Sequence, residues 1–248
     1  MRIRTDRCVG CGHCIPYCPM QALRLENGHA AVNREACVEC SACVRNGCPF
    51  GAIEFEDLPW PRVLRRFFSD PNFSHSTTTK GMGRGTAEMK TNDVTGRYRR
   101  GKVGIGIELG RPDVGVGFDD IEVVTRRLGE WGIEFEEKNP LTSIMSDKKR
   151  GVFQEDVKGE RFLSCIVEFS VDTERLGEAM EIIRELDQKL STVFSVFMCS
   201  RAEEDGSIRN VEEAKRLGYW VSPNAKCNVG LGRPLFREDA AGPKSEVC

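Results

Sequence analysis

Two stretches decide the fold of the N-terminal part of this chain: CVGCGHCIPYCP at residues 8–19 and CVECSACVRNGCP at residues 37–49. They contain eight of the 12 cysteines in the 248-residue chain. In each stretch three cysteines are separated by two residues, and a fourth cysteine stands directly before a proline. Because the spacing is written twice, it predicts two equivalent sites for a group that takes several thiolate ligands.

Cysteines at this spacing are typical of iron–sulfur binding, since three thiolates two residues apart can turn around one cluster. The fourth cysteine lies too far along the chain to join them, and in two-cluster proteins it binds the other cluster. We therefore expect two [4Fe-4S] clusters, each with four cysteine ligands. The expected sets are Cys8, Cys11, Cys14 and Cys48 for the first cluster, and Cys37, Cys40, Cys43 and Cys18 for the second.

The residues around the cysteines are duplicated as well. Residues 18–26 match residues 48–56 from Cys-Pro onward, and an apolar residue precedes each run by five positions (Ile3 and Val32). Over residues 1–57 the chain resembles the bacterial dicluster [4Fe-4S] ferredoxin family. The resemblance implies a small fold with two short hairpins that carries single electrons at low potential.

One departure from the family pattern lies in the second run. Four residues, Val44 to Gly47, separate its last two cysteines, whereas the first run and the family have three. Asn and Gly tolerate a positive φ, so we expect a bulged turn at Asn46-Gly47 to absorb the extra residue. Backbone N–H groups of Gly10, Gly12, Ser41 and Ala42 are expected to donate to sulfur and tune the reduction potential.

Other interpretations of the cysteines fit the pattern less well. Disulfide scaffolds form in oxidising compartments, and no export signal precedes Cys8. Zinc sites normally use two well-separated pairs of cysteines. The remaining cysteines, Cys165, Cys199, Cys227 and Cys248, have no partners at ligand spacing, so we expect no third cluster. The thiols are expected to stay reduced, in the cytoplasm of an anaerobic cell.

The composition and net charge limit the kinds of partner that we expect. The net charge is −2 and the sequence pI is near 6.1, which argues against general nucleic-acid binding. No apolar run approaches the length needed to cross a bilayer. We therefore expect neither a nucleic-acid partner nor membrane insertion.

The sequence pattern divides the chain into four parts. Residues 1–57 are the cluster-binding domain, 58–101 a linker with a Gly-rich basic loop, 102–204 an α/β domain, and 205–248 a C-terminal helix, an extended segment and a flexible tail. Within the linker, residues 63–68 predict a short amphipathic helix.

The part at 102–204 follows strand and helix periodicities in turn. Expected strands cover 102–110, 133–137, 161–171 and 192–201, and expected helices cover 119–131 and 173–190. This order predicts a ferredoxin-like βαββαβ plait with a four-stranded antiparallel sheet and two helices on one face. The whole chain is thus expected to be α+β. The plait, unrelated to the cluster-binding fold, is similar at the level of pattern to ACT-type domains.

One face of that sheet is small and apolar rather than charged. Val103 and Ile105 are expected to face the helices, while Gly104, Gly106 and Phe197 face the other way. Such a face needs a cover, which packing within the chain, a homodimer or a ligand can supply. The Gly-rich basic loop at 80–101 can bind an anion through its backbone N–H groups, or serve as a docking segment or plain linker.

The leading functional hypothesis is an electron-transfer protein, or a subunit of an oxidoreductase complex, whose C-terminal domain docks one redox partner protein. A standalone carrier of this type needs only about sixty residues, so the remainder must serve recognition, regulation or assembly. The alternative is a redox-linked regulatory protein whose plait binds a small molecule. The sequence contains no recognisable catalytic set, nucleotide fingerprint or flavin motif, so no catalytic residues are expected.

Overall fold

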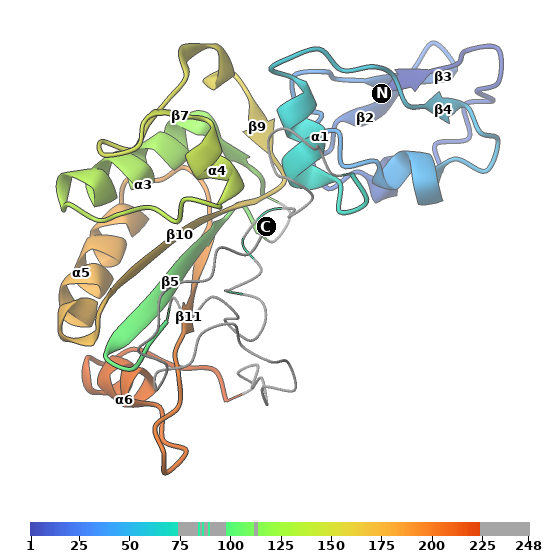
Figure 1. Ribbon diagram of the computed structural model, residues 1–248. Helices are drawn as coiled ribbons and strands as arrows, with labels where there is room; N and C mark the ends of the chain where they lie inside the picture. Colours follow the sequence, from blue (N-terminus) through green and yellow to red (C-terminus); the bar gives the residue numbers. More distant parts are fainter. Residues whose placement is uncertain (74–83, 85, 87–88, 90–97, 112–113, 224–248) are drawn as a thin grey trace, which may run out of the picture.

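The structure is a computed structural model that describes residues 1–73, 84, 86, 89, 98–111 and 114–223. The expectations for most of the Gly-rich loop, and for Cys227, Cys248 and the tail, lie outside these residues. The chain forms two lobes with helix α1 (Val63–Ser69) between them (Figure 1). No helix in the described ranges is long and apolar enough to cross a membrane.

The N-terminal lobe contains two small antiparallel sheets. β1 (Arg2–Ile3) pairs with β4 (Ile53–Glu54), and β2 (Leu23–Glu26) pairs with β3 (His29–Val32). The first and last strands of the lobe, β1 and β4, are therefore neighbours. This places the two cysteine runs side by side, as the contacts between their helical turns show.

Each cysteine run contains one short helical turn, and the two turns differ. The first is a 3₁₀ turn, η1 (Ile15–Tyr17), and the second is a π-helical turn, η2 (Cys43–Gly47). The expectation of a positive-φ bulge at Asn46-Gly47 was wrong, because neither residue is among the described positive-φ positions. A π turn closes over one more residue than an α turn, so it absorbs the extra residue of the second run.

Helix α1 packs into the C-terminal lobe through its apolar side. Leu64, Phe67 and Phe68 belong to the core of that lobe, and the rings of Phe68 and Phe162 lie 4.4 Å apart. The hydroxyl of Ser69 accepts a hydrogen bond of 2.8 Å from the backbone N–H of Leu163. The amphipathic helix expected in the linker is therefore present, and it is an integral part of the C-terminal core.

The main sheet of the C-terminal lobe has three antiparallel strands, in the order β10 (Cys165–Asp172), β5 (Lys102–Leu109), β11 (Phe194–Cys199). Helices α3 (Phe118–Glu130) and α5 (Leu176–Asp187) cover one face (Figure 1). The remaining described elements are β6 (Val116–Gly117), α4 (Pro140–Ser143), β7 (Met145–Asp147), β8 (Val152–Phe153), η3 (Glu155–Val157), β9 (Arg161–Phe162), η4 (Thr173–Arg175) and α6 (Arg209–Arg216).

The expected four-stranded sheet is not found in the described part of the chain. The segment expected as a strand at 133–137 makes a single bridge, between Phe135 and Phe169 beside β10. Gly132, with a φ of 80°, turns the chain just before it, and Asn139 already caps α4 by accepting the N–H of Leu141. The segment therefore adds one bridge and no strand to the sheet, and the structure shows a mixed α+β lobe with a three-stranded main sheet.

The two faces of the sheet follow the predicted alternation. Ile105 and Ile107 lie opposite Phe169 and Val167, and all four belong to the core beneath the helices. On the other face, a Cβ added to Gly104 would come within 2.2 Å of the Tyr98 ring. A Cβ at Gly106 would come equally close to the ring of Phe197. Side chains of this same chain therefore cover the two glycines.

Candidate metal centres

The first pocket of the N-terminal lobe gathers four cysteines from both runs. Cys8, Cys11 and Cys14 come from the first run, and Cys48 comes from the second. The rest of the lining is uncharged and consists of Val9, Gly12, Ala30, Gly47, Phe50, Ala52 and Ile53. About 300 Å³ free of atoms, partly open to solvent, lies between these side chains.

The second pocket mirrors the first. Cys37, Cys40 and Cys43 come from the second run, and Cys18 comes from the first. Its other lining residues are Met1, Tyr17, Met20, Ala22, Leu23, Val32 and Val38, around about 320 Å³ free of atoms. Each pocket thus contains the four cysteines that the spacing assigns to one cluster, with the Cys-Pro cysteine contributed by the opposite run.

The eight thiols suit a multinuclear group better than a single ion. None of them is in a disulfide, and no group of three or more metal-binding side chains among the described residues has the geometry to hold one metal ion. A [4Fe-4S] cluster separates its thiolates, because the irons and sulfides occupy the space between them. Two quartets around open, uncharged pockets therefore fit such a group.

The cysteines of each quartet affect one another's pKa. Burial, followed by the neighbouring Cys40 and Cys37, raises the pKa of Cys43 to about 12. The pKa of Cys14 is raised by burial and then by Cys48, which belongs to the other run. Burial, the largest influence on both, disfavours the charged thiolate, and a bound metal cluster would supply the compensating positive charge.

Backbone N–H groups donate hydrogen bonds to sulfurs of both quartets. Ala22 donates to Sγ of Cys18 at 3.2 Å, and Ala52 donates to Sγ of Cys48 at the same distance. Ala30 donates to Sγ of Cys8 at 3.3 Å. Such bonds favour the thiolate.

Ala42 is one of the four N–H donors expected from the sequence. Its backbone hydrogen bond lowers the pKa of Cys40, but burial is the larger influence and raises that pKa. Ala22, Ala30 and Ala52 were not among the expected donors. For two of them a signal was available: the repeated Cys-Pro-x-x-Ala, which places Ala22 and Ala52 four residues after a ligand-type cysteine.

Backbone conformation is duplicated between the runs, although the residues are not. Gly10 and Gly12 have φ values of 68° and 69°, and the matching positions, Glu39 and Ser41, have 57° and 67°. Glycine adopts this left-handed region freely, whereas other residues lose stability there. The second run must therefore be held in place by contacts that the first run does not need.

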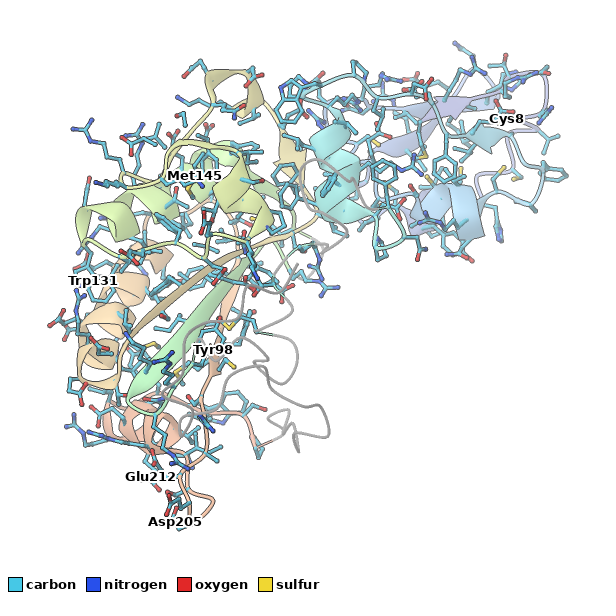
Figure 2. All side chains as sticks on the ribbon, viewed as in Figure 1. Cys8, Tyr98, Trp131, Met145, Asp205 and Glu212 are labelled. Atoms are coloured by element: carbon cyan, nitrogen blue, oxygen red, sulfur yellow. The ribbon has the colours of Figure 1, made fainter. Side chains whose placement is uncertain are left out.

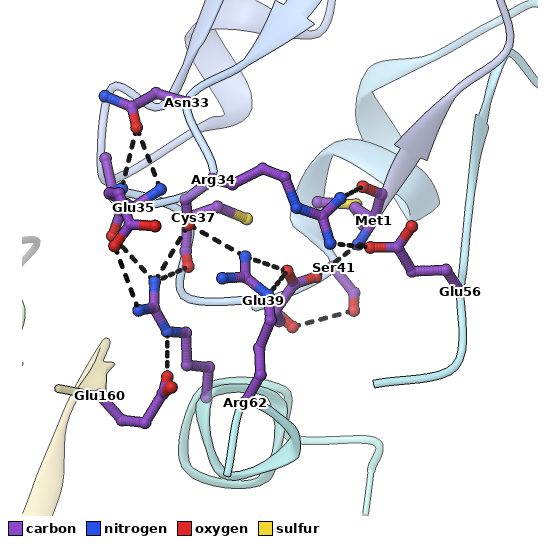
Figure 3. Close-up of polar contacts among 12 residues, drawn as sticks. Met1, Asn33, Arg34, Glu35, Cys37, Glu39, Ser41, Glu56, Arg62 and Glu160 are labelled. Carbon is purple, nitrogen blue, oxygen red and sulfur yellow. Dashed lines mark hydrogen bonds and ion pairs between the residues drawn. The ribbon is translucent and has the colours of Figure 1, made fainter. Parts of the chain in front are cut away.

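Helix α1 and its ends supply those contacts (Figure 3). The carboxylate of Glu39 is buried and pairs with Arg62 at 2.7 Å and with the terminal ammonium of Met1 at 2.8 Å. Burial raises the pKa of Glu39, but hydrogen bonds from that ammonium and from Arg62 outweigh it and hold the pKa below its usual value.

Asp70, at the C-terminal end of α1, is the second anchor. Its buried carboxylate accepts a hydrogen bond of 2.8 Å from the hydroxyl of Ser41. It also accepts hydrogen bonds of 2.6 and 2.7 Å from the two Nη atoms of Arg45. Burial alone raises its pKa, yet the hydrogen bonds from Arg45 and Ser41 leave the pKa lowered overall. Asp70 is therefore charged at neutral pH and ties the second run to the helix.

Arg65 joins this loop to the C-terminal lobe. Its side chain is only 3 % exposed and donates to the carbonyl oxygens of Arg34, Glu35 and Cys37 at 3.1, 2.8 and 2.9 Å. On its other side Arg65 pairs with Glu160, which precedes β9. One buried guanidinium thus connects the backbone beside a cluster cysteine to the second lobe.

Comparisons with known proteins match this part of the chain. A family model described as a 4Fe-4S dicluster domain covers residues 1–61. An uncharacterized ferredoxin of Methanocaldococcus jannaschii is 34 % identical over 61 residues, which are 23 % of this chain and 36 % of that protein. Ferredoxin-1 of Rhodobacter capsulatus is 31 % identical over 58 residues, 19 % of this chain and 89 % of that protein.

A ferredoxin of Pyrobaculum islandicum is 44 % identical over 52 residues, 21 % of this chain and 48 % of that protein. The chain thus spans well under half the length of the first of these relatives and nearly all of Ferredoxin-1. No solved structure matches the chain. Through residues 1–61 the chain belongs to the 4Fe-4S dicluster ferredoxin family, whose eight cysteines imply two [4Fe-4S] clusters in an iron–sulfur electron-transfer domain, while the remainder has no assigned family.

Proposed function

We propose that the protein passes single electrons, through two [4Fe-4S] clusters, to or from a dedicated redox partner that its C-terminal lobe docks. The observation that carries this proposal is the pair of pockets, each surrounded by three cysteines of one run and one of the other. In this proposal the ligands are Cys8, Cys11, Cys14 and Cys48 for one cluster, and Cys37, Cys40, Cys43 and Cys18 for the other. When bound, each cluster supplies one-electron oxidation and reduction.

The residues of the chain fit this role. Four thiolates complete the coordination of a cluster and leave no position for a substrate, which favours electron transfer over substrate activation. Ala22, Ala30 and Ala52 donate hydrogen bonds to the sulfurs and thereby stabilise the thiolates. Buried Met1 and Leu23 keep water away from the second quartet.

The contacts between the lobes support a docking role for the C-terminal part. Arg65 and Ser69 of α1 bind Glu160 and Leu163, which are both residues of the C-terminal lobe. A partner bound to that lobe would therefore be held at a fixed position relative to the second quartet. Fixed separation is what efficient electron transfer to one partner requires.

Metal analysis and spectroscopy of the full chain test the proposal. Anaerobically reconstituted protein should contain about eight irons per chain and show two magnetically interacting centres when reduced. Cys11→Ala should abolish the signal of one centre and Cys40→Ala that of the other. A chain that takes up only a small fraction of this iron would contradict the proposal.

The alternative, a regulator that binds a small molecule on the outer sheet face, has weaker support. Tyr98 and Phe197 already fill the space over Gly104 and Gly106. Of the described arginines of the Gly-rich loop, Arg84 pairs with Glu108 at 2.9 Å and Arg100 with Glu203 at 3.6 Å. Docking of a second copy on this face stays a prediction, which sedimentation of the reconstituted protein tests.

A further inference from the structure

The end of the N-terminal lobe around the first quartet exposes apolar side chains. Val9 is 61 % exposed, Phe50 53 % and Leu25 47 %. Val9 and Phe50 line the pocket of the first quartet, and Leu25 lies against Gly12, between two of its cysteines. Cys11 itself is exposed in the middle of this group. We call Val9, Leu25 and Phe50 the apolar end surface.

This surface has an uncharged centre and an edge of paired charges. Residues 8–22 and 46–53, which surround the first quartet, contain no Asp, Glu, Lys or Arg. At its edge the charged side chains pair within the chain: Arg24 with Glu26 at 2.5 Å, and Arg7, together with Arg2 and Arg4, with Glu54. An uncharged apolar centre inside a polar rim is the usual anatomy of a protein–protein interface.

The second quartet is less exposed. Cys37 and Cys43 are buried, Cys18 and Cys40 are half-buried, and α1 binds the loop that carries Cys37 and Cys43 through Arg62, Arg65 and Asp70. Cys8, by contrast, lies at the end of the lobe that points away from α1 and the C-terminal lobe (Figure 2). The two quartets thus give the lobe one end fixed to its own chain and one end free for an external protein.

We propose that the apolar end surface docks a second redox protein, whose own face around its redox centre is apolar and uncharged. The inference rests on the proposed function: electrons that one partner supplies beside the C-terminal lobe must leave elsewhere, and the first quartet is the open end. Because the centre is uncharged and the edge charges already have partners within the chain, apolar contact rather than charge selects this second protein.

Voltammetry of the reconstituted full chain tests the docking chemistry without knowledge of the partner. Three gold electrodes are used, coated with monolayers that end in methyl, carboxylate or ammonium groups. The exchange rate should be fastest on the methyl layer and should not change between about 0.05 and 0.5 M salt, a range that screens charge-driven contacts. A faster, salt-sensitive rate on either charged layer would overturn the proposal.

Variants locate the contact. Val9→Glu and Leu25→Glu should each slow exchange on the methyl layer by about thirtyfold, the size of one interface hot spot. Val123→Glu is the matched control, since Val123 is 37 % exposed on α3 in the other lobe, and its rate should be unchanged. The exchange rate of each variant is measured at the midpoint potential of that variant. A change in potential is therefore not mistaken for a change in docking.

The outcomes separate this inference from the function on which it rests. Wild type without iron or without a voltammetric signal would contradict the electron-transfer function itself. A normal signal with equal rates in Leu25→Glu and Val123→Glu would leave that function intact and overturn the docking surface. Leu25 does not line the pocket, so its substitution should leave the iron content unchanged.

Discussion

The two cysteine runs have nearly the same spacing and opposite surroundings. The first uses Gly10 and Gly12 at its left-handed positions, is uncharged and lies at the free end of the lobe. The second places Glu39 and Ser41 at those positions and is tied through them to α1. The same ligand pattern is thus supported in the first run by the backbone freedom of glycine and in the second run by contacts to another part of the chain.

The energies of these two solutions differ in kind. A non-glycine residue in the left-handed region costs about 1–2 kcal/mol. Breaking a buried ion pair by removing one partner costs about 3–5 kcal/mol, which exceeds that strain. The second run is therefore stable only while its anchors are intact, and substitutions at the anchors should affect the second quartet more than the first.

The largest effect is expected for Arg65→Met. The change leaves three loop carbonyls and Glu160 without their buried donor, so the free energy of unfolding should fall by about 3–5 kcal/mol. Chemical denaturation under anaerobic conditions measures the loss. Arg2→Met, at an exposed ion pair with Glu54, should lose less than about 1 kcal/mol. Equal losses in the two variants would show that Arg65 is not an anchor.

Asp70→Asn should come next. The substitution removes the charge that Arg45 and Arg66 neutralise, with an expected loss of about 2–4 kcal/mol. The EPR signal that Cys40→Ala removes should broaden or weaken in this variant, and the signal that Cys11→Ala removes should stay sharp. If both signals change alike, the second run does not depend on α1 as described.

The same carboxyl gives a pH dependence. The folded pKa of Asp70 lies below its ordinary value of 3.8, so its contribution is complete above pH 3.8 and is lost as the pH falls through the folded pKa. The difference in unfolding free energy between wild type and Asp70→Asn should therefore be constant near neutral pH and shrink below pH 3.8. A difference that grows on acidification would contradict the assigned sign.

The smallest effect distinguishes the strain of the left-handed backbone at Ser41 from the contribution of its hydrogen bond to Asp70. Ser41→Ala loses the hydrogen bond to Asp70 and keeps the left-handed backbone, whereas Ser41→Gly loses the same bond and relieves the strain. The glycine variant should be more stable than the alanine variant by about 1 kcal/mol. Denaturation midpoints of the two variants measure the difference, and equal midpoints would mean that the loop is unstrained.

Local patterns in the sequence predicted much of this architecture. Strict alternation from Val103 to Leu109 predicted the faces of β5, because a strand turns successive side chains to opposite sides, and the register with β10 confirms it. Helices α3 and α5 were also predicted, since both have continuous apolar stripes. The family of the N-terminal part followed from cysteine spacing alone.

What the sequence could not predict depends on contacts between distant residues. Arg65 binds Glu160, 95 positions away, and nothing in the residues near Arg65 indicates that partner. The segment around Phe135 has a strand-like pattern, yet it makes only one bridge, to Phe169. At the π turn, a Cβ added to Gly47 would come within 3.1 Å of the Cα of Cys14, so a close approach between the two runs favours glycine there.

The most direct test of the central claim is the exchange of ligands between the runs. EPR spectra of reduced Cys18→Ala and Cys48→Ala should be compared with those of Cys40→Ala and Cys11→Ala. We expect Cys18→Ala to alter the same centre as Cys40→Ala, and Cys48→Ala the same centre as Cys11→Ala. If Cys18→Ala instead altered the centre that depends on Cys11, each run would hold its own cluster and the account would be wrong.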